Sequence, residues 1–193
     1  MPEYKLTLRK MLKHLNVVNK HRFKVFCFCC KVGIPFQGLV HDLSKYSPTE
    51  FIESAKYYTD GKYSPISNCK KDKGYSIAWI HHKNHNKHHY EYWYDYAAPT
   101  KAPIIPFKYF LEMACDSFAA GITYAGKDWT KETQLIFWKR AREKAQLHPA
   151  MMNLFDRLYK DVSIKGLKPV LKRKYLKKIY YEYTDNRSEN INE

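Results

Sequence analysis

Residues 41–50 read His-Asp-Leu-Ser-Lys-Tyr-Ser-Pro-Thr-Glu, and the second half of this stretch carries the clearest helix start in the chain. Ser47 can cap a helix, Pro48 has its φ angle preset for the first turn, and Glu50 can reach back as in a capping box. The stretch therefore predicts a helix that continues until Thr59-Asp60-Gly61 ends it.

The sequence on both sides of this helix is helical in pattern as well. Apolar residues recur at helical spacing from about Leu6 to Val32, and Gly33 and Pro35 end that element. Ser64-Pro65 repeats the start signal. Further helices are predicted over about residues 75–82, 107–124, 130–146 and 150–161, and a short segment lies around residues 37–45. Because no window alternates as a strand would, we expect an all-α protein, a helical bundle of six to eight helices.

Composition excludes several classes of protein. The chain has 193 residues, of which 45% are hydrophobic and 16% aromatic, so it is neither disordered nor of low complexity. The longest apolar run, Val25 to Cys30, is too short for a transmembrane segment, and the charged N-terminus lacks the apolar part of a signal peptide. Five Cys without a secretory signal indicate free thiols in a reducing compartment. We therefore expect a cytoplasmic protein.

The formal charge of +15 predicts partners that carry phosphate, but it does not choose among nucleotides, nucleic acids and a membrane surface. We expect one domain over residues 1–163, followed over 164–193 by a basic, Tyr-rich helix and a disordered acidic end. An apolar stripe with a spacing of four follows this helix, at Leu167, Leu171, Tyr175, Ile179 and Tyr183. The stripe can dock on the chain's own domain, on a partner or on an anionic surface.

Histidine is concentrated in one short segment. Five of the nine His lie in the run His81-His82-Lys83-Asn84-His85-Asn86-Lys87-His88-His89. Other candidates are His21 in the first helix, the doublet His41-Asp42 followed by Lys45, and Asp116 in a later helix. Imidazole and carboxylate are the common ligands of Zn²⁺, Mn²⁺ and Fe²⁺, and several must converge to hold one ion.

Each of these features is weak when taken alone. A His-Asp pair arises by chance, a His-rich run can be a solvated surface, and His21 or Asp116 alone would be an ordinary helix residue. The order of the candidates along separate helices is what indicates a metal site. His14, His85 and His148 lack such a context, and the sequence gives them no role.

That order resembles the HD superfamily of metal-dependent phosphohydrolases, whose signature is an early His, a His-Asp doublet and a final Asp on a later helix of a helical bundle. The matching residues are His21, His41-Asp42 and Asp116. The branch with a two-metal site is more similar still, because Lys45 and the paired His88-His89 also have counterparts there. A Gly-Tyr-Pro ending marks the branch that acts on cyclic dinucleotides. This chain lacks that ending and has Ser44 where that branch has Gly, so cyclic dinucleotides are not the expected substrate.

The chain also resembles an uncharacterised family of bacterial and phage proteins over about residues 6–158. The shared segments begin at His41, with His-Asp-Leu-Ser-Lys-Tyr-Ser-Pro-Thr-Glu-Phe, and at His81, with His-His-Lys-x-x-Asn-x-His-His-x-Glu-Tyr-Trp. This second resemblance implies no activity.

The HD resemblance implies roles for these residues. The implied metal ligands are His21, His41, Asp42, His82, His88, His89 and Asp116, for one or two ions of Mn, Fe, Zn, Co or Ni. Asp42 would bridge two ions and Lys45 would act on the phosphate, whereas the sequence leaves open whether His81 or His82 is the ligand. Lys83, Lys87 and Trp93 are candidate substrate-binding residues.

The function expected from this resemblance is a metal-dependent phosphohydrolase that acts on a nucleotide or another small phosphoester. Two alternatives remain open: a catalytically silent metal-binding scaffold of the same fold, and a basic nucleic-acid-binding protein. The sequence does not indicate the oligomeric state.

Overall fold

The structure, a computed structural model, describes residues 4–61 and 63–185 and is built from helices, with no strand in these residues. The ten α-helices of this described part are α1 (Leu8–Lys31), α2 (Pro35–Val40), α3 (Pro48–Tyr57), α4 (Pro65–Lys73), α5 (Ile77–His85), α6 (Phe107–Ala125), α7 (Thr133–Ala141), α8 (Pro149–Lys165), α9 (Leu167–Val170) and α10 (Arg173–Thr184). Four short 3₁₀ helices are η1 (Leu43–Tyr46), η2 (Tyr90–Trp93), η3 (Gly126–Asp128) and η4 (Arg142–Lys144).

The predicted all-α class is confirmed, and the helix count exceeds the six to eight expected. Part of the difference comes from α2, which is too short to show an apolar period of its own. The rest comes from the basic tail, where the chain bends at Leu171 and Lys172 and forms α9 and α10 in place of one helix. The predicted start of α3 is also correct, since the Ser47 hydroxyl accepts a hydrogen bond from the Glu50 backbone amide.

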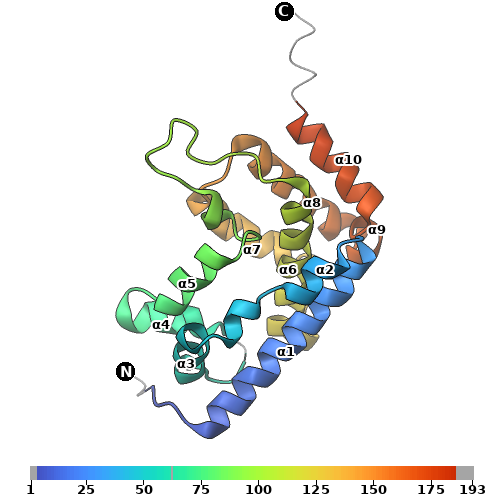
Figure 1. The fold of residues 1–193 in the computed structure, drawn as a ribbon. Coiled ribbons are helices and arrows are strands. Elements are labelled where there is room, and N and C mark those ends of the chain that lie inside the picture. Colours follow the sequence, from blue (N-terminus) through green and yellow to red (C-terminus); the bar gives the residue numbers. More distant parts are fainter. Residues whose placement is uncertain (1–3, 62, 186–193) are drawn as a thin grey trace, which may run out of the picture.

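The helices form two groups that share α1. In Figure 1, α3, α4 and α5 lie along one half of α1, while α6 to α10 gather along the other half. The larger group encloses the main hydrophobic core, in which α6 and α8 contribute Phe110, Phe118, Leu154 and Leu158, all fully buried. Because α1 contacts α2, α3 and α6, residues on its inner face can meet side chains from both groups.

Helix α2 lies very close to α1, and this contact places the His41-Asp42 doublet. A Cβ atom at Gly38 would lie 2.6 Å from the Cβ of Cys29, so only glycine permits this approach. Arg22 of α1 then holds the end of α2, donating from Nε to the His41 carbonyl at 2.7 Å and from Nη2 to the Leu39 carbonyl at 2.8 Å. These charge-assisted bonds fix the chain just before Asp42.

The C-terminal helices dock on the chain's own domain. Val170, Leu171, Leu176, Ile179 and Tyr180 are buried in the same core as α6 and α8. The sequence leaves open three docking surfaces for the C-terminal helix, and the structure shows it docked on the chain's own domain. The predicted disordered acidic end falls mainly on residues 186–193, which lie outside the described residues. Within the part that is described, none of the helices combines the length and apolar character needed to cross a lipid bilayer.

Candidate metal centre

Seven residues singled out in the sequence converge between the two helix groups. Their ligand atoms form two sets, and within each set all the atoms lie within 4.8 Å of one another. The first set is His21, His41, Asp42 and Asp116, and the second is Asp42, His82, His88 and His89. Asp42 is the member common to both.

Asp42 occupies an unusual turn between α2 and η1. Its φ angle of 56° and ψ angle of 26° place it in the left-handed region, where it is the one residue other than glycine with a positive φ in the described chain. An aspartate tolerates this conformation better than most residues do, although at a cost in strain. The turn buries the carboxylate, which is 2% exposed, between the two helix groups.

The first set forms around one carboxylate oxygen of Asp42. Asp42 Oδ2 lies 3.3 Å from His41 Nε2 and 3.6 Å from His21 Nε2. Asp116 of α6 closes the set, with Oδ1 at 3.0 Å from His21 Nε2 and 3.5 Å from His41 Nε2. The ligand atoms of this first set therefore come together from three elements: α1, α6 and the end of α2.

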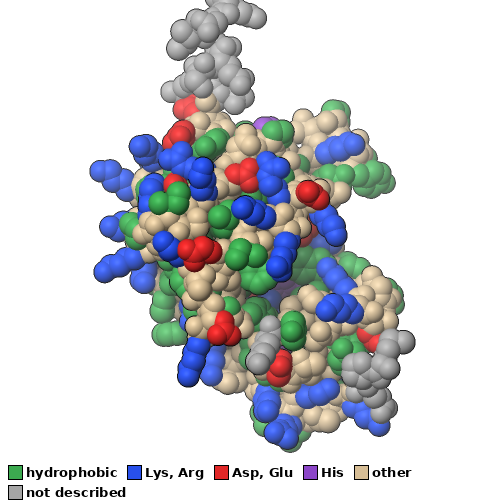
Figure 2. Space-filling view, turned by 180° about the vertical axis from the view of Figure 1, so that it is seen from behind, with side chains coloured by type: hydrophobic (Ala, Val, Ile, Leu, Met, Phe, Trp, Pro, Cys, Tyr) green, Lys and Arg blue, Asp and Glu red, His purple; other side chains and the backbone are tan. Residues whose placement is uncertain are grey.

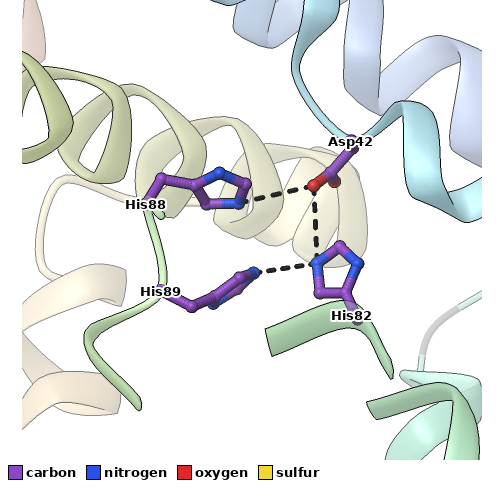
Figure 3. A group of neighbouring side chains, drawn as sticks. All are labelled: Asp42, His82, His88 and His89. Carbon is purple, nitrogen blue, oxygen red and sulfur yellow. Dashed lines mark hydrogen bonds and ion pairs between the residues drawn. The ribbon is translucent and has the colours of Figure 1, made fainter. Parts of the chain in front are cut away.

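The second set forms around the other oxygen of the same carboxylate. Figure 3 shows Asp42 Oδ1 facing His82 Nε2 and His88 Nε2, each at 3.4 Å, with His89 Nε2 at 2.9 Å from His82 Nε2. His82 comes from α5, whereas His88 and His89 follow the turn after that helix. Of the pair left open by the sequence, His82 belongs to the cluster, and His81 belongs to neither ligand set.

Two glutamates, which the sequence analysis did not identify as site residues, orient four of the histidines. Glu112 Oε1 lies 2.9 Å from His41 Nδ1 and 3.1 Å from His88 Nδ1. Glu50 lies 2.7 Å from His81 Nδ1 and 2.8 Å from His82 Nδ1. A carboxylate on Nδ1 fixes the ring and its tautomer, leaving Nε2 free to face an ion.

The position of Glu50 corrects the predicted capping box. Its side chain turns to the histidines of α5 in place of its own helix terminus. The sequence does indicate that Glu112 lies near the cluster. It precedes Asp116 by four residues and therefore shares a face of α6 with it.

The charges around the cluster favour a cation. Burial alone would raise the pKa of Asp42, but His41 and Lys45 outweigh it and hold this pKa well below its usual range. Neighbouring histidines likewise lower the pKa of Asp116 against the effect of burial, and they lower that of Glu112 to about 2. All three carboxyl groups are therefore ionised at neutral pH.

Two of the histidines are held in the form that binds metal. Burial lowers the pKa of His89 well below its usual value, and His88 and His82 add to this effect. Burial and the Lys45 ammonium lower the pKa of His82. Neutral imidazole is the form that binds metal. Burial also opposes a charge on His41 and His88, but Asp42 and Glu112 outweigh it and raise the pKa of both rings.

Buried polar atoms that lack a hydrogen bond test whether the site fits an ion. His41 Nε2, His88 Nε2 and Asp42 Oδ1 are buried and have no hydrogen-bond partner. Buried polar atoms without partners are costly, and in native proteins a bound water or ion usually satisfies them. All three atoms belong to the two ligand sets, so the residues present fit one or two divalent ions.

A cavity of about 180 Å³ reaches the cluster from one side. Its walls include ligand residues of both sets, namely His21, Asp42, His82, His89 and Asp116. Lys45 also lines it, with Nζ 3.3 Å from Asp42 Oδ2. Burial opposes the charge of Lys45, but Asp42 outweighs this effect and raises the pKa of the ammonium group, so that it stays cationic. Figure 2 shows the molecule from behind, with a hollow in the surface that is bordered by hydrophobic side chains and by several Lys and Arg side chains.

The three candidate substrate-binding residues lie away from this cavity. Neither Lys83, Lys87 nor Trp93 is among its lining residues. Lys87 borders a separate pocket of about 600 Å³ behind His41 and His88, and the indole of Trp93 donates to the Lys87 carbonyl at 2.8 Å. The structure thus brings the predicted metal ligands and Lys45 together. Lys83 and Trp93 line neither of these two pockets, and Lys87 lies beside His41 and His88 only at the second one.

Fold and site together define an all-α protein with a buried candidate metal centre. The chain belongs to a family of unknown function (DUF5662), whose family model matches residues 10–161. That range contains every residue of the cluster. Comparisons with curated proteins and with solved structures found no significant match.

Proposed function

We propose that this protein is a divalent-metal-dependent phosphohydrolase that acts on a nucleotide or another small phosphoester. The observation that carries the proposal is the position of Asp42, which directs one carboxylate oxygen to each of two ligand sets. Such an arrangement suits a pair of ions held by one bridging carboxylate. The order of the ligand residues, which resembles that of the HD superfamily, supports the same reaction.

Bound divalent ions would supply a water of lowered pKa and would neutralise charge at phosphorus. The chain's own residues would do the rest. Lys45 would bind a phosphate oxygen, since its ammonium group faces the cavity beside Asp42. Glu112 and Glu50 would keep the histidine rings in place throughout turnover.

The cavity argues for catalysis over the alternative of a silent scaffold. Structural metal sites are closed by protein ligands, whereas catalytic sites keep a position open for water or substrate. Here five of the ligand residues also line a cavity, so a small molecule can reach both sets. The cationic Lys45 favours an anion as that molecule.

The test is a hydrolysis assay on protein purified without a His tag and loaded with Mn²⁺, Fe²⁺ or Zn²⁺. We expect phosphate release from a panel of phosphomonoesters and nucleotides. Lys45→Met should lower kcat/KM by about 10- to 1,000-fold without changing metal content, because it removes one stabilising charge. Metal-loaded protein that hydrolyses none of the panel would support the scaffold instead.

A further inference from the structure

His14 is a buried side chain that its surroundings do not satisfy. It is 7% exposed, and its Nδ1 atom is buried without a hydrogen-bond partner. Its ring packs near the rings of Phe51 and Tyr58, with centroid distances of 5.5 and 6.1 Å. Packing against two aromatic rings needs no nitrogen atoms, so packing alone does not explain a histidine here.

His14 also lines the cavity that reaches the metal centre. It precedes His21 by seven residues, nearly two helical turns, so the two rings lie on the same face of α1. The rise of the helix separates them by about 10 Å. Val17 and Val18 line the cavity as well, so its wall follows α1 from one histidine to the other.

Electrostatics keep His14 in its neutral form. Burial lowers its pKa to about 4, and the ammonium group of Lys45 adds to this effect. A neutral imidazole offers one donor and one acceptor, so it can bind a hydroxyl group but has no charge with which to attract phosphate. Lys45, at the metal end, carries that charge.

We infer that His14 recognises the alcohol part of the phosphoester, by hydrogen-bonding a hydroxyl group of a compact, sugar-sized leaving group while the phosphate lies at the metal centre. This inference rests on the proposed function. A phosphate next to His21 leaves roughly half of the 10 Å separation for the rest of the substrate, which matches a pentose or a small polyol. The small volume of the cavity, about 180 Å³, fits the same size class.

Ligand binding tests the inference without requiring turnover. Titration calorimetry would use Mn²⁺-loaded, untagged protein and two probes: inorganic phosphate, and a ribose 5-phosphate analogue in which methylene replaces the ester oxygen. His14→Phe keeps a ring against Phe51 and Tyr58 but removes both nitrogens, and His14→Gln restores one donor and one acceptor.

We expect His14→Phe to weaken binding of the ribose analogue about tenfold and to leave binding of inorganic phosphate and the metal content unchanged. We also expect its Tm to rise by about 2–4 °C, because an unsatisfied buried polar atom is removed. His14→Gln should recover part of the lost affinity.

The possible failures are distinguishable. If His14→Phe binds both probes as the wild type does, or loses both probes equally, the role of His14 is overturned and the phosphohydrolase proposal stands. If the wild-type protein binds neither probe while carrying metal, the proposed function fails, and the inference fails with it.

Discussion

At the scale of single residues, Asp42 combines a strained backbone conformation with a carboxylate that lies between the two ligand sets. Its left-handed backbone costs free energy, and such residues persist where the surrounding structure holds them. Arg22 supplies part of that hold through its bonds to the carbonyls of His41 and Leu39. The strained turn lets a single carboxylate face both ligand sets.

This strain predicts a difference between two variants of Asp42. Asp42→Ala and Asp42→Gly both remove the carboxylate, so both should lose bound metal. Because glycine adopts a positive φ freely, Asp42→Gly should be more stable than Asp42→Ala by about 1–2 kcal/mol. Urea unfolding of the metal-free proteins measures the difference, and equal stabilities would show that the turn relaxes in these variants.

A second residue-scale prediction concerns Glu112, which holds His41 and His88 through their Nδ1 atoms. Glu112→Gln should lower metal affinity by about 10- to 100-fold while the helices remain folded, because a neutral amide oxygen is a weaker acceptor than the carboxylate that orients both rings. Competition with a metal chelator measures the affinity. Glu143→Gln, at an exposed position, is the control and should bind metal like the wild type.

The convergence of the candidate metal ligands could be predicted from the sequence, because residue type and order along the chain indicate it. The orienting residues could not, because Glu50 also fits a capping box and nothing local directs it to α5. Nor does the sequence indicate a role for His14, because its missing hydrogen-bond partner is a property of the folded state.

At the scale of secondary-structure elements, a buried carboxylate joins α8 to α10. Asp161 of α8 accepts hydrogen bonds from Tyr175 of α10 and from Arg157, at 2.6 Å, within its own helix. Lys165 adds an ion pair at 3.1 Å. Burial alone would raise the pKa of Asp161, but these bonds outweigh it and lower the pKa.

This junction predicts a pH dependence of stability. Because the pKa of Asp161 is lower in the folded than in the unfolded chain, its ionised form stabilises the fold above the unfolded value, near 4. The stabilisation is lost as the pH falls through the lower folded value. At pH 7 we expect Asp161→Asn to be less stable than the wild type by roughly 1–3 kcal/mol, and this gap should narrow below pH 4.

Unfolding of the metal-free proteins at pH 7 and at pH 3 checks this prediction. Asp128→Asn, at an exposed position on η3, is the matched control and should show little difference from the wild type at either pH. A gap for Asp161→Asn that stays constant with pH would contradict the assignment.

The elements themselves differ in how well the sequence predicts them. Long amphipathic helices such as α1, α6 and α8 follow from apolar spacing and from Gly and Pro at their ends. The path of the segment that follows α5 cannot be predicted from such patterns. Asn86 ends that helix by bonding the His82 carbonyl and the Ser44 hydroxyl, a contact with η1 that turns His88 and His89 back to the cluster.

At the scale of the whole molecule, the C-terminal helix is part of the main core. Leu176 is fully buried there, whereas Ile164, near the end of α8, is 62% exposed. We expect Leu176→Ala to lower the free energy of unfolding by about 2–5 kcal/mol and Ile164→Ala to change it by less than about 0.5 kcal/mol. If both variants cost equally little, the docked position of α10 would be wrong.

The candidate metal centre also bears on this scale, because its candidate ligands come from both helix groups. α1, α5, α6 and the turn after α2 all contribute, so bound ions would join parts that otherwise meet mainly along α1. Anything that binds the folded state alone stabilises it, so metal should raise Tm and chelation should lower it.

The most direct test of the account is the metal content of untagged protein, measured for the wild type, His21→Ala, His89→Ala and Asp42→Ala. His21→Ala and His89→Ala, the single-set variants, each remove a ligand from one of the two ligand sets. Asp42→Ala removes the ligand common to both sets. We predict about two equivalents of divalent transition metal in the reloaded wild type, about one in each single-set variant, and nearly none in Asp42→Ala. A wild type that binds no metal after reloading, or an Asp42→Ala protein that keeps its full content, would contradict the account.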